Sequence, residues 1–145
     1  IRDRSFFEWI EANAPVVAAL EPEPLATLVR RCAELHMRHI ATGGDPFEQG
    51  SARPLDYGHW AAHKLEGLTA HALRHGEAVA IGLRLDSTYA ALAGLLPETD
   101  LARIDALLDS LGLPGWHDAL DATTPAGRRA VLAGLEDFRE HLGGE

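Results

Sequence analysis

Apolar residues recur at helical spacing along almost the whole of this chain. Leu25, Leu28, Val29, Cys32 and Leu35 repeat at i, i+3, i+4 and i+7, which is the pattern of one apolar helix face. No segment of the sequence alternates apolar and polar residues in the way that indicates a β-strand. The periodicity therefore predicts an all-α fold, a helical bundle of five to seven helices that forms a single domain over residues 1–145.

Capping residues and prolines suggest where the outer helices begin and end. Ser5, with Glu8 three residues later, forms a candidate capping box. Pro15 is expected to break the first helix or to start a second turn. Near the other end, Thr123 or Thr124 is expected to cap the last helix, with a proline close to its first position.

The middle of the chain is divided by glycine-rich segments. Residues 43–54 are rich in turn formers and are predicted to be a loop, whereas residues 67–74 are ambiguous. Gly82, inside an apolar helix, predicts close packing against a neighbouring element. Helices are expected at about 5–20, 25–40, 55–66, 77–96, 98–113 and 123–142.

The charge and the cysteine content exclude several classes of function. The formal net charge of −9 disfavours nucleic acid as a partner, because phosphate binding needs a basic surface, and it disfavours a cationic membrane-surface helix. A single cysteine, Cys32, excludes an intrachain disulfide and a cysteine-rich zinc motif and is compatible with the cytoplasm. No apolar run is long enough to span a membrane. The chain starts without a methionine, so we expect it to be part of a longer protein.

The segment "LDYGHWAAHKLE" (55–66) holds the candidate metal ligands. His59, His63 and Glu66 are spaced to project from one helix face, and paired histidines on one face recur in zinc sites. His75 follows His59 by sixteen residues, which on one straight helix would place it roughly 160° away. A helix break near Gly67, or a new helix before Gly76, would be needed to bring His75 to the same point.

A simpler interpretation is that these are solvated surface histidines. His36 and His39 are also three residues apart, and no other signal accompanies them. From the residues alone, the sequence predicts a helical domain with a candidate two-histidine metal site.

Several motifs together resemble the C-terminal helical domain of 3-dehydroquinate synthase and its sugar phosphate cyclase relatives. The resemblance rests on "LDYGH" with His63 and Glu66, on "HGEAVAIG" (75–82), and on the flanking "FFEWIE", "DPFEQG" and "LLDSLGLP" segments. It covers roughly residues 5–114. In that family an N-terminal domain holds NAD, and a divalent metal, usually zinc, lies between the two domains. Members are commonly dimeric, so the resemblance allows a homodimer.

The resemblance implies roles for individual residues. His59 and His75 would bind the metal (zinc or cobalt), and His63 would contact the substrate phosphate as the catalytic residue. Arg53, Asp56 and Arg38 are implied as substrate-binding residues. Arg53 lies six residues before His59 rather than seven, and Arg38 falls near the position of a catalytic lysine.

The sequence also departs from the family pattern. Asp56 stands where asparagine is usual and adds negative charge near a phosphate, while Trp60 and Lys64 are further departures. These changes favour a divergent cyclase with a substrate other than the heptulosonate phosphate of the shikimate pathway. The third metal ligand, a glutamate, and the glycine-rich NAD segment would both precede Ile1, so we expect this chain to be inactive alone.

The resemblance implies a specific reaction, with two alternatives. Transient oxidation by NAD would acidify a neighbouring C–H bond, phosphate would leave, and an aldol closure would follow the re-reduction. One alternative is the helical domain of an iron- or zinc-dependent polyol or alcohol dehydrogenase, which transfers hydride only. The other is a non-catalytic helical interaction module.

Overall fold

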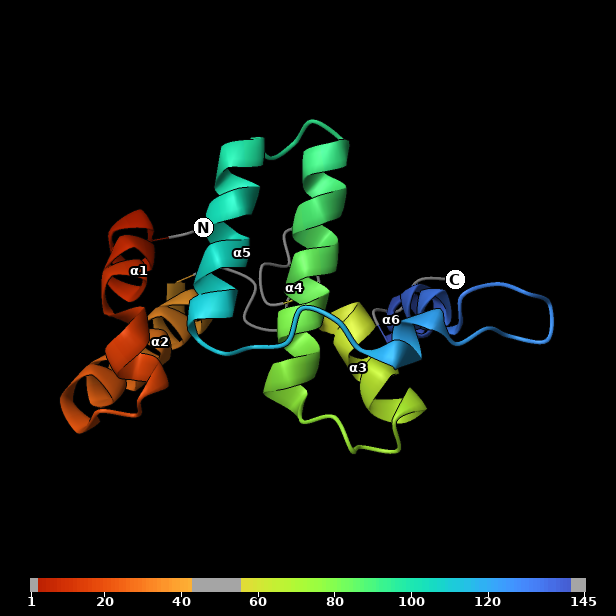
Figure 1. Cartoon of the computed structure of the whole chain (residues 1–145), viewed down its shortest axis with the longest axis horizontal. Helices are drawn as coiled ribbons and strands as arrows, with labels where there is room; N and C mark the ends of the chain where they lie inside the picture. Colours follow the sequence, from red (N-terminus) through yellow and green to blue (C-terminus); the bar gives the residue numbers. More distant parts are fainter. Residues whose placement is uncertain (1–2, 43–55, 142–145) are drawn as a thin grey trace.

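The computed structural model describes residues 3–42 and 56–141, with side chains described up to residue 137. Within this part, the chain forms helices and no named strand, so the all-α prediction is confirmed. Six α-helices and two short 3₁₀ helices are present there (Figure 1): α1 (Arg4–Ala18), α2 (Pro22–Thr42), α3 (His59–Leu68), α4 (His75–Leu92), α5 (Glu98–Ser110), η1 (Asp118–Asp121), η2 (Ala130–Leu132) and α6 (Ala133–His141). The predicted loop at 43–54 and Arg53 lie outside the described residues.

The described helices pack in series across the molecule. The helix α2 packs on α1, α1 on α5, α5 on α4, α4 on α3, and α3 on α6, so α1 and α2 lie at one side of Figure 1 and α3 and α6 at the other. Ion pairs join some of these neighbours. Arg103 of α5 contacts Glu11 of α1 at 2.6 Å, and Arg84 of α4 contacts Asp105 of α5 at 3.1 Å. Among the described helices, none is both long and apolar enough to cross a lipid bilayer.

The start and the course of α1 differ from the prediction. Its N-cap is Asp3 rather than Ser5, because the Asp3 carboxylate accepts the N–H of Phe6 at 2.9 Å. The predicted break at Pro15 does not occur, and the helix continues to Ala18. Proline costs one backbone hydrogen bond, but Val17 beyond it is buried, so tertiary packing holds the last turn in place.

The core that positions the site lies between α3 and α4. Ala61, Ala62 and Leu65 of α3 are fully buried against Ile81 of α4, because small side chains allow two helices to approach closely. Gly82 faces Gly58 at the start of α3, where an added Cβ on Gly82 would lie 2.8 Å from the Gly58 carbonyl carbon. The close packing predicted at Gly82 is confirmed.

The last predicted helix is wrong over its first part. Residues 123–129 form a turn, in which Thr124 N–H donates to the Arg128 carbonyl at 2.8 Å and Thr123 pairs with Arg129 in an isolated antiparallel bridge. Gly127 adopts φ +76°, a left-handed conformation that glycine tolerates best. The α-helix therefore begins only at Ala133, because the backbone groups before it are hydrogen-bonded in the turn.

Candidate metal centre

A sharp reversal between α3 and α4 brings the predicted histidines together. The helix α3 ends at Leu68, and the connecting residues include Ala70 (φ 49°) and His71 (φ 62°), both in the left-handed region. The second helix then starts at His75 itself. One continuous helix would place His75 roughly 160° away from His59. The break between α3 and α4 removes this separation, and such a break was the condition for a shared site.

The rings of His59, His63 and His75 form a nearly equilateral triangle. Their centroids are 5.9 Å apart for His59 and His63, and 5.6 Å apart for each of the other two pairs. His63 and His75 keep more than half of their side-chain surface exposed. The cluster is therefore open on one side, which leaves room for a substrate or for a further ligand.

Glu66 contacts two of the three rings from the buried side. One carboxylate oxygen, Oε2, lies 3.1 Å from His75 Nδ1 and 3.2 Å from His63 Nδ1. The side chain is 15% exposed, so this carboxylate is largely removed from bulk water. The hydrogen bond from His75 holds the pKa of the Glu66 carboxyl below its ordinary value, and contact with His63 adds to the effect. Glu66 is therefore charged at neutral pH.

These contacts leave one nitrogen of each ring available as a ligand. Nδ1 of His63 and of His75 faces Glu66, and Nδ1 of His59 lies 3.2 Å from the Tyr57 carbonyl oxygen. A histidine that binds a metal ordinarily donates its other ring N–H to a carboxylate or a carbonyl. The donor set therefore fits a divalent metal through Nε2. Ligand atoms of His63, Glu66 and His75 lie within 4.8 Å of one another, and His59 is not in that set. The His59 ring joins the cluster through its centroid distances of 5.9 Å to His63 and 5.6 Å to His75.

The remaining predicted site residues in the described part of the chain are Asp56 and Arg38. Asp56 is half-buried, and its carbonyl accepts the His59 N–H at 2.9 Å, which puts it directly before the cluster. Arg38 is exposed near the end of α2, a helix that packs only on α1 among the described helices. The structure thus brings the rings of His59, His63 and His75 together. The roles of all the predicted site residues, Asp56, Arg38 and Arg53 included, stay predictions.

Trp60, which lies between His59 and His63 in the chain, is partly buried. Its ring packs against the α3–α4 core, and its indole N–H donates to Asp86 Oδ1 at 2.8 Å. Its contacts are therefore with the core rather than with the histidine rings. The sequence reasoning missed Asp86, although its position one helical turn after Gly82 placed it on the face of α4 that meets α3.

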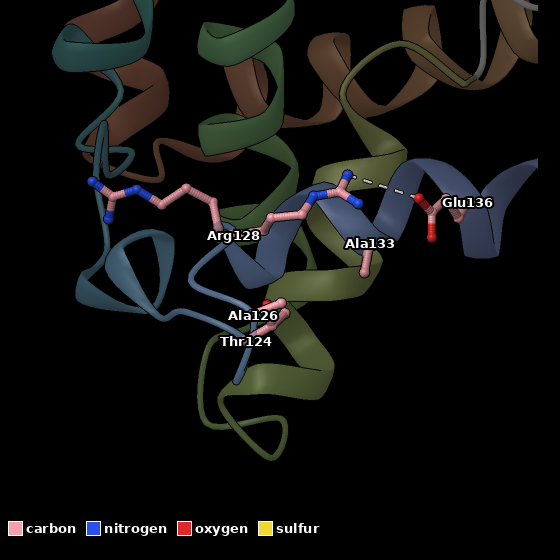
Figure 2. A pocket seen from close by; sticks show the side chains of 6 residues that line it. Thr124, Ala126, Arg128, Ala133 and Glu136 are labelled. Carbon is pink, nitrogen blue, oxygen red and sulfur yellow. Dashed lines mark ion pairs between the residues drawn. The ribbon is translucent and has the colours of Figure 1, made fainter.

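The described residues also line a shallow surface pocket near the C-terminal side (Figure 2). Its lining comes from the 124–129 turn and from α6, where Arg128 and Glu136 face each other at 3.8 Å. It shares no residue with the histidine cluster. Both charged side chains are mostly exposed, so the pocket offers no dehydrated site for chemistry.

Comparison with known proteins places these motifs in one family. The family model described as 3-dehydroquinate synthase C-terminal matches residues 1–130. The chain belongs to this family. The 3-dehydroquinate synthase of Neisseria meningitidis serogroup C is 39% identical over 113 residues, which cover 77% of this chain and 31% of that enzyme. The 3-dehydroquinate synthase of Xylella fastidiosa strain M12 is 36% identical over 120 residues, which cover 79% of this chain and 32% of that enzyme.

A solved structure from the same group agrees with this membership. It is 2-epi-5-epi-valiolone synthase (ValA) from Streptomyces hygroscopicus subsp. jinggangensis 5008, with NAD⁺ and Zn²⁺ bound. The likeness has a TM-score of 0.78 at 28% identity and covers 98% of this chain and 38% of that one. The chain spans about a third of the length of the curated relatives it matches.

Proposed function

We propose that this chain supplies the metal- and substrate-binding half of an NAD-dependent sugar phosphate cyclase. The other half of the cleft would be an N-terminal domain that holds NAD. The observation that carries the proposal is the cluster of His59, His63, His75 and Glu66, built from the family's own motifs at the α3–α4 junction. The named activities of the relatives, 3-dehydroquinate synthase and 2-epi-5-epi-valiolone synthase, support the same class of reaction.

His59 and His75 are the proposed metal ligands. Each presents Nε2 while its Nδ1 is oriented, by the Tyr57 carbonyl in one case and by Glu66 in the other. Fixed ring orientation strengthens binding, because less freedom is lost when the metal binds. The choice of these two among the three histidines rests on the family pattern. The bound zinc of the ValA structure supports a divalent metal.

His63 is the proposed phosphate-facing residue. Its ring is 58% exposed beside the other two rings, so it can meet a substrate that lies on the cluster. The Glu66 carboxylate lies 3.2 Å from Nδ1 and can accept its N–H. When His63 is the imidazolium, both ring nitrogens are donors, so Nε2–H can donate to a phosphate oxygen and assist its departure while Nδ1–H stays on Glu66. Asp56 lies directly before the cluster in the chain and is proposed to contact the substrate. Its negative charge is proposed to disfavour binding of a further negatively charged substrate group at that position.

When bound, the metal and NAD would supply the polarisation and the transient oxidation that make the substrate C–H bond acidic. This chain's own residues hold the ligand sphere, orient the rings and donate to the leaving phosphate. A substrate other than the heptulosonate phosphate is proposed, since Asp56 replaces the neutral amide that is usual in the family.

The natural full chain tests the proposal through its products. Phosphate release without net NADH supports a cyclase, whereas net NADH formed with an alcohol substrate would identify a dehydrogenase. His63→Ala is expected to keep the metal and to lose phosphate release. His59→Ala and His75→Ala are expected to lose the metal. If elemental analysis finds no zinc, cobalt or iron in the purified protein and His59→Ala changes nothing, the chain is a non-catalytic module.

A further inference from the structure

One carboxylate on α4 binds the two residues that flank His59. Asp86 Oδ2 accepts the backbone N–H of Gly58 at 2.6 Å, and Oδ1 accepts the indole N–H of Trp60 at 2.8 Å. All three residues are at least half-buried. Both oxygens of one side chain are therefore used by the start of α3, from a helix 26 to 28 residues further along the chain.

The start of α3 needs an external acceptor. Its N-cap is Gly58, which has no side chain and makes no capping hydrogen bond. The first N–H groups of a helix have no partner within the helix, and a negative charge at this end is favourable because the helix dipole is positive there. Asp86 provides both the acceptor and the charge. Hydrogen bonds to an ionised group are shorter and stronger than neutral ones.

Asp86 also sets the rotation of α3 relative to α4. Gly82 and Asp86 lie one turn apart on the same face of α4. Contact between Gly82 and Gly58 limits how close the two helices come. The two bonds from Asp86 then hold donors two residues apart, so α3 cannot turn about its axis without breaking one of them. His59 lies between these donors, and His75 belongs to the same helix as Asp86.

From this geometry we propose that Asp86, with Trp60 as its partner, is a positioning residue for the metal site. It holds the His59 ring 5.6 Å from the His75 ring, where both rings can reach one metal. This inference rests on the proposed function, in which His59 and His75 are ligands. Trp60, which departs from the family pattern, then has a defined task in orienting a ligand rather than in contacting substrate.

Two conservative variants separate positioning from simple stability. Trp60→Phe keeps an aromatic ring in the core and removes only the N–H donor. Asp86→Asn keeps the side-chain volume and places an amide NH₂ against one of the two donors. Lys64→Gln is the matched control, because it breaks the 2.8 Å contact of α3 with Asp137 of α6 without touching the start of α3.

The measurement is Co²⁺ affinity and the visible spectrum of bound Co²⁺, in the natural full chain, at a temperature where every variant is folded. We expect Trp60→Phe and Asp86→Asn each to weaken Co²⁺ binding about tenfold, the lower end of the effect of losing an orienting partner. The double variant Trp60→Phe/Asp86→Asn should lose less Co²⁺ affinity than the product of the two single fold-losses. Without the indole N–H, the amide oxygen of Asn can accept from the Gly58 N–H alone. Lys64→Gln should bind Co²⁺ as the wild type does.

The possible outcomes distinguish the two proposals. If both single variants lower Tm but bind Co²⁺ with wild-type affinity and spectrum, Asp86 is only structural and the inference is overturned, while the proposed function stands. If the wild-type protein itself binds no Co²⁺, the proposed function is wrong and the inference is overturned with it.

Discussion

Gly82 of α4 lies against Gly58 of the α3 start with no room for a side chain between them. A Cβ on Gly82 would overlap the Gly58 carbonyl, and a Cβ on Gly58 would lie 2.7 Å from the Leu83 nitrogen. Both neighbours are backbone, which cannot rotate away as a flexible side chain can. This contact sets the separation of the two helices that carry the histidine cluster.

We expect Gly82→Ala to destabilise the fold and to disturb the site together. Overpacking a tight contact costs about 1–3 kcal/mol, so Tm should fall. The matched control is Gly67→Ala in α3, where an added Cβ meets nothing within 4 Å and φ is not positive. Alanine is favoured over glycine in a helix, so the control should be neutral or slightly stabilising. Equal Tm values for the two variants would contradict the close contact.

Glu66→Gln is expected to weaken metal binding. The neutral amide can no longer accept from two ring N–H groups with a full negative charge, so His63 and His75 lose their common orienting partner. Loss of such a partner costs about 10–100-fold in metal affinity. Titration with Zn²⁺ or Co²⁺ measures the change. Glu77→Gln is the control, because that carboxylate on α4 contacts Arg74 and no histidine, and unchanged affinity in both variants would refute the role of Glu66.

Acid should lower the free energy of unfolding by weakening an ion pair between α1 and α5. The guanidinium of Arg103 hydrogen-bonds Glu11 and holds the pKa of that carboxyl below its usual value of 4.5. A carboxyl whose pKa is lower in the folded state contributes stability above the unfolded pKa, and this contribution is lost as pH falls through the folded pKa. The difference in unfolding free energy between wild type and Glu11→Gln should therefore be largest above about pH 4.5 and should shrink below it.

Denaturant titrations of both proteins between pH 7 and pH 3 test this expectation. Glu8→Gln serves as the comparison, because Glu8 lies 4.0 Å from Arg103 and is more exposed. A difference that stays constant across the whole pH range would show that the Arg103–Glu11 contact does not contribute.

The N-cap of α1 can be tested by two single substitutions. Asp3→Ala should lower Tm, because it removes the acceptor for the Phe6 N–H and the partner of Arg31 at 2.8 Å. Ser5→Ala should have a smaller effect, because Ser5 lies inside the helix and only donates to Asp3. Thermal unfolding followed by circular dichroism compares them. A larger loss for Ser5→Ala would restore the capping assignment that the sequence suggested.

Much of the secondary structure was determined by local sequence. The end of α2 and the course of α4 follow from apolar periodicity and from glycine placement, which act over a few residues. The resemblance of "LDYGH" and "HGEAVAIG" to a family was visible without coordinates, and the family comparison bears it out. Errors occurred where local signals competed, at Pro15 and in the 123–129 turn. At Pro15, tertiary packing of the last turn of α1 outweighed the local preference. In the 123–129 turn, backbone pairing within the segment itself replaced the expected helix.

Only the tertiary structure decided how the site is assembled. The sequence placed His59, His63 and Glu66 on one face of α3, but the reversal at residues 69–74 was needed to bring His75 to them. The contact of Glu66 with His75, and of Asp86 with Gly58 and Trp60, joins the start and end of α3 to α4. Such contacts depend on the relative rotation and separation of α3 and α4, which no periodicity within one helix specifies.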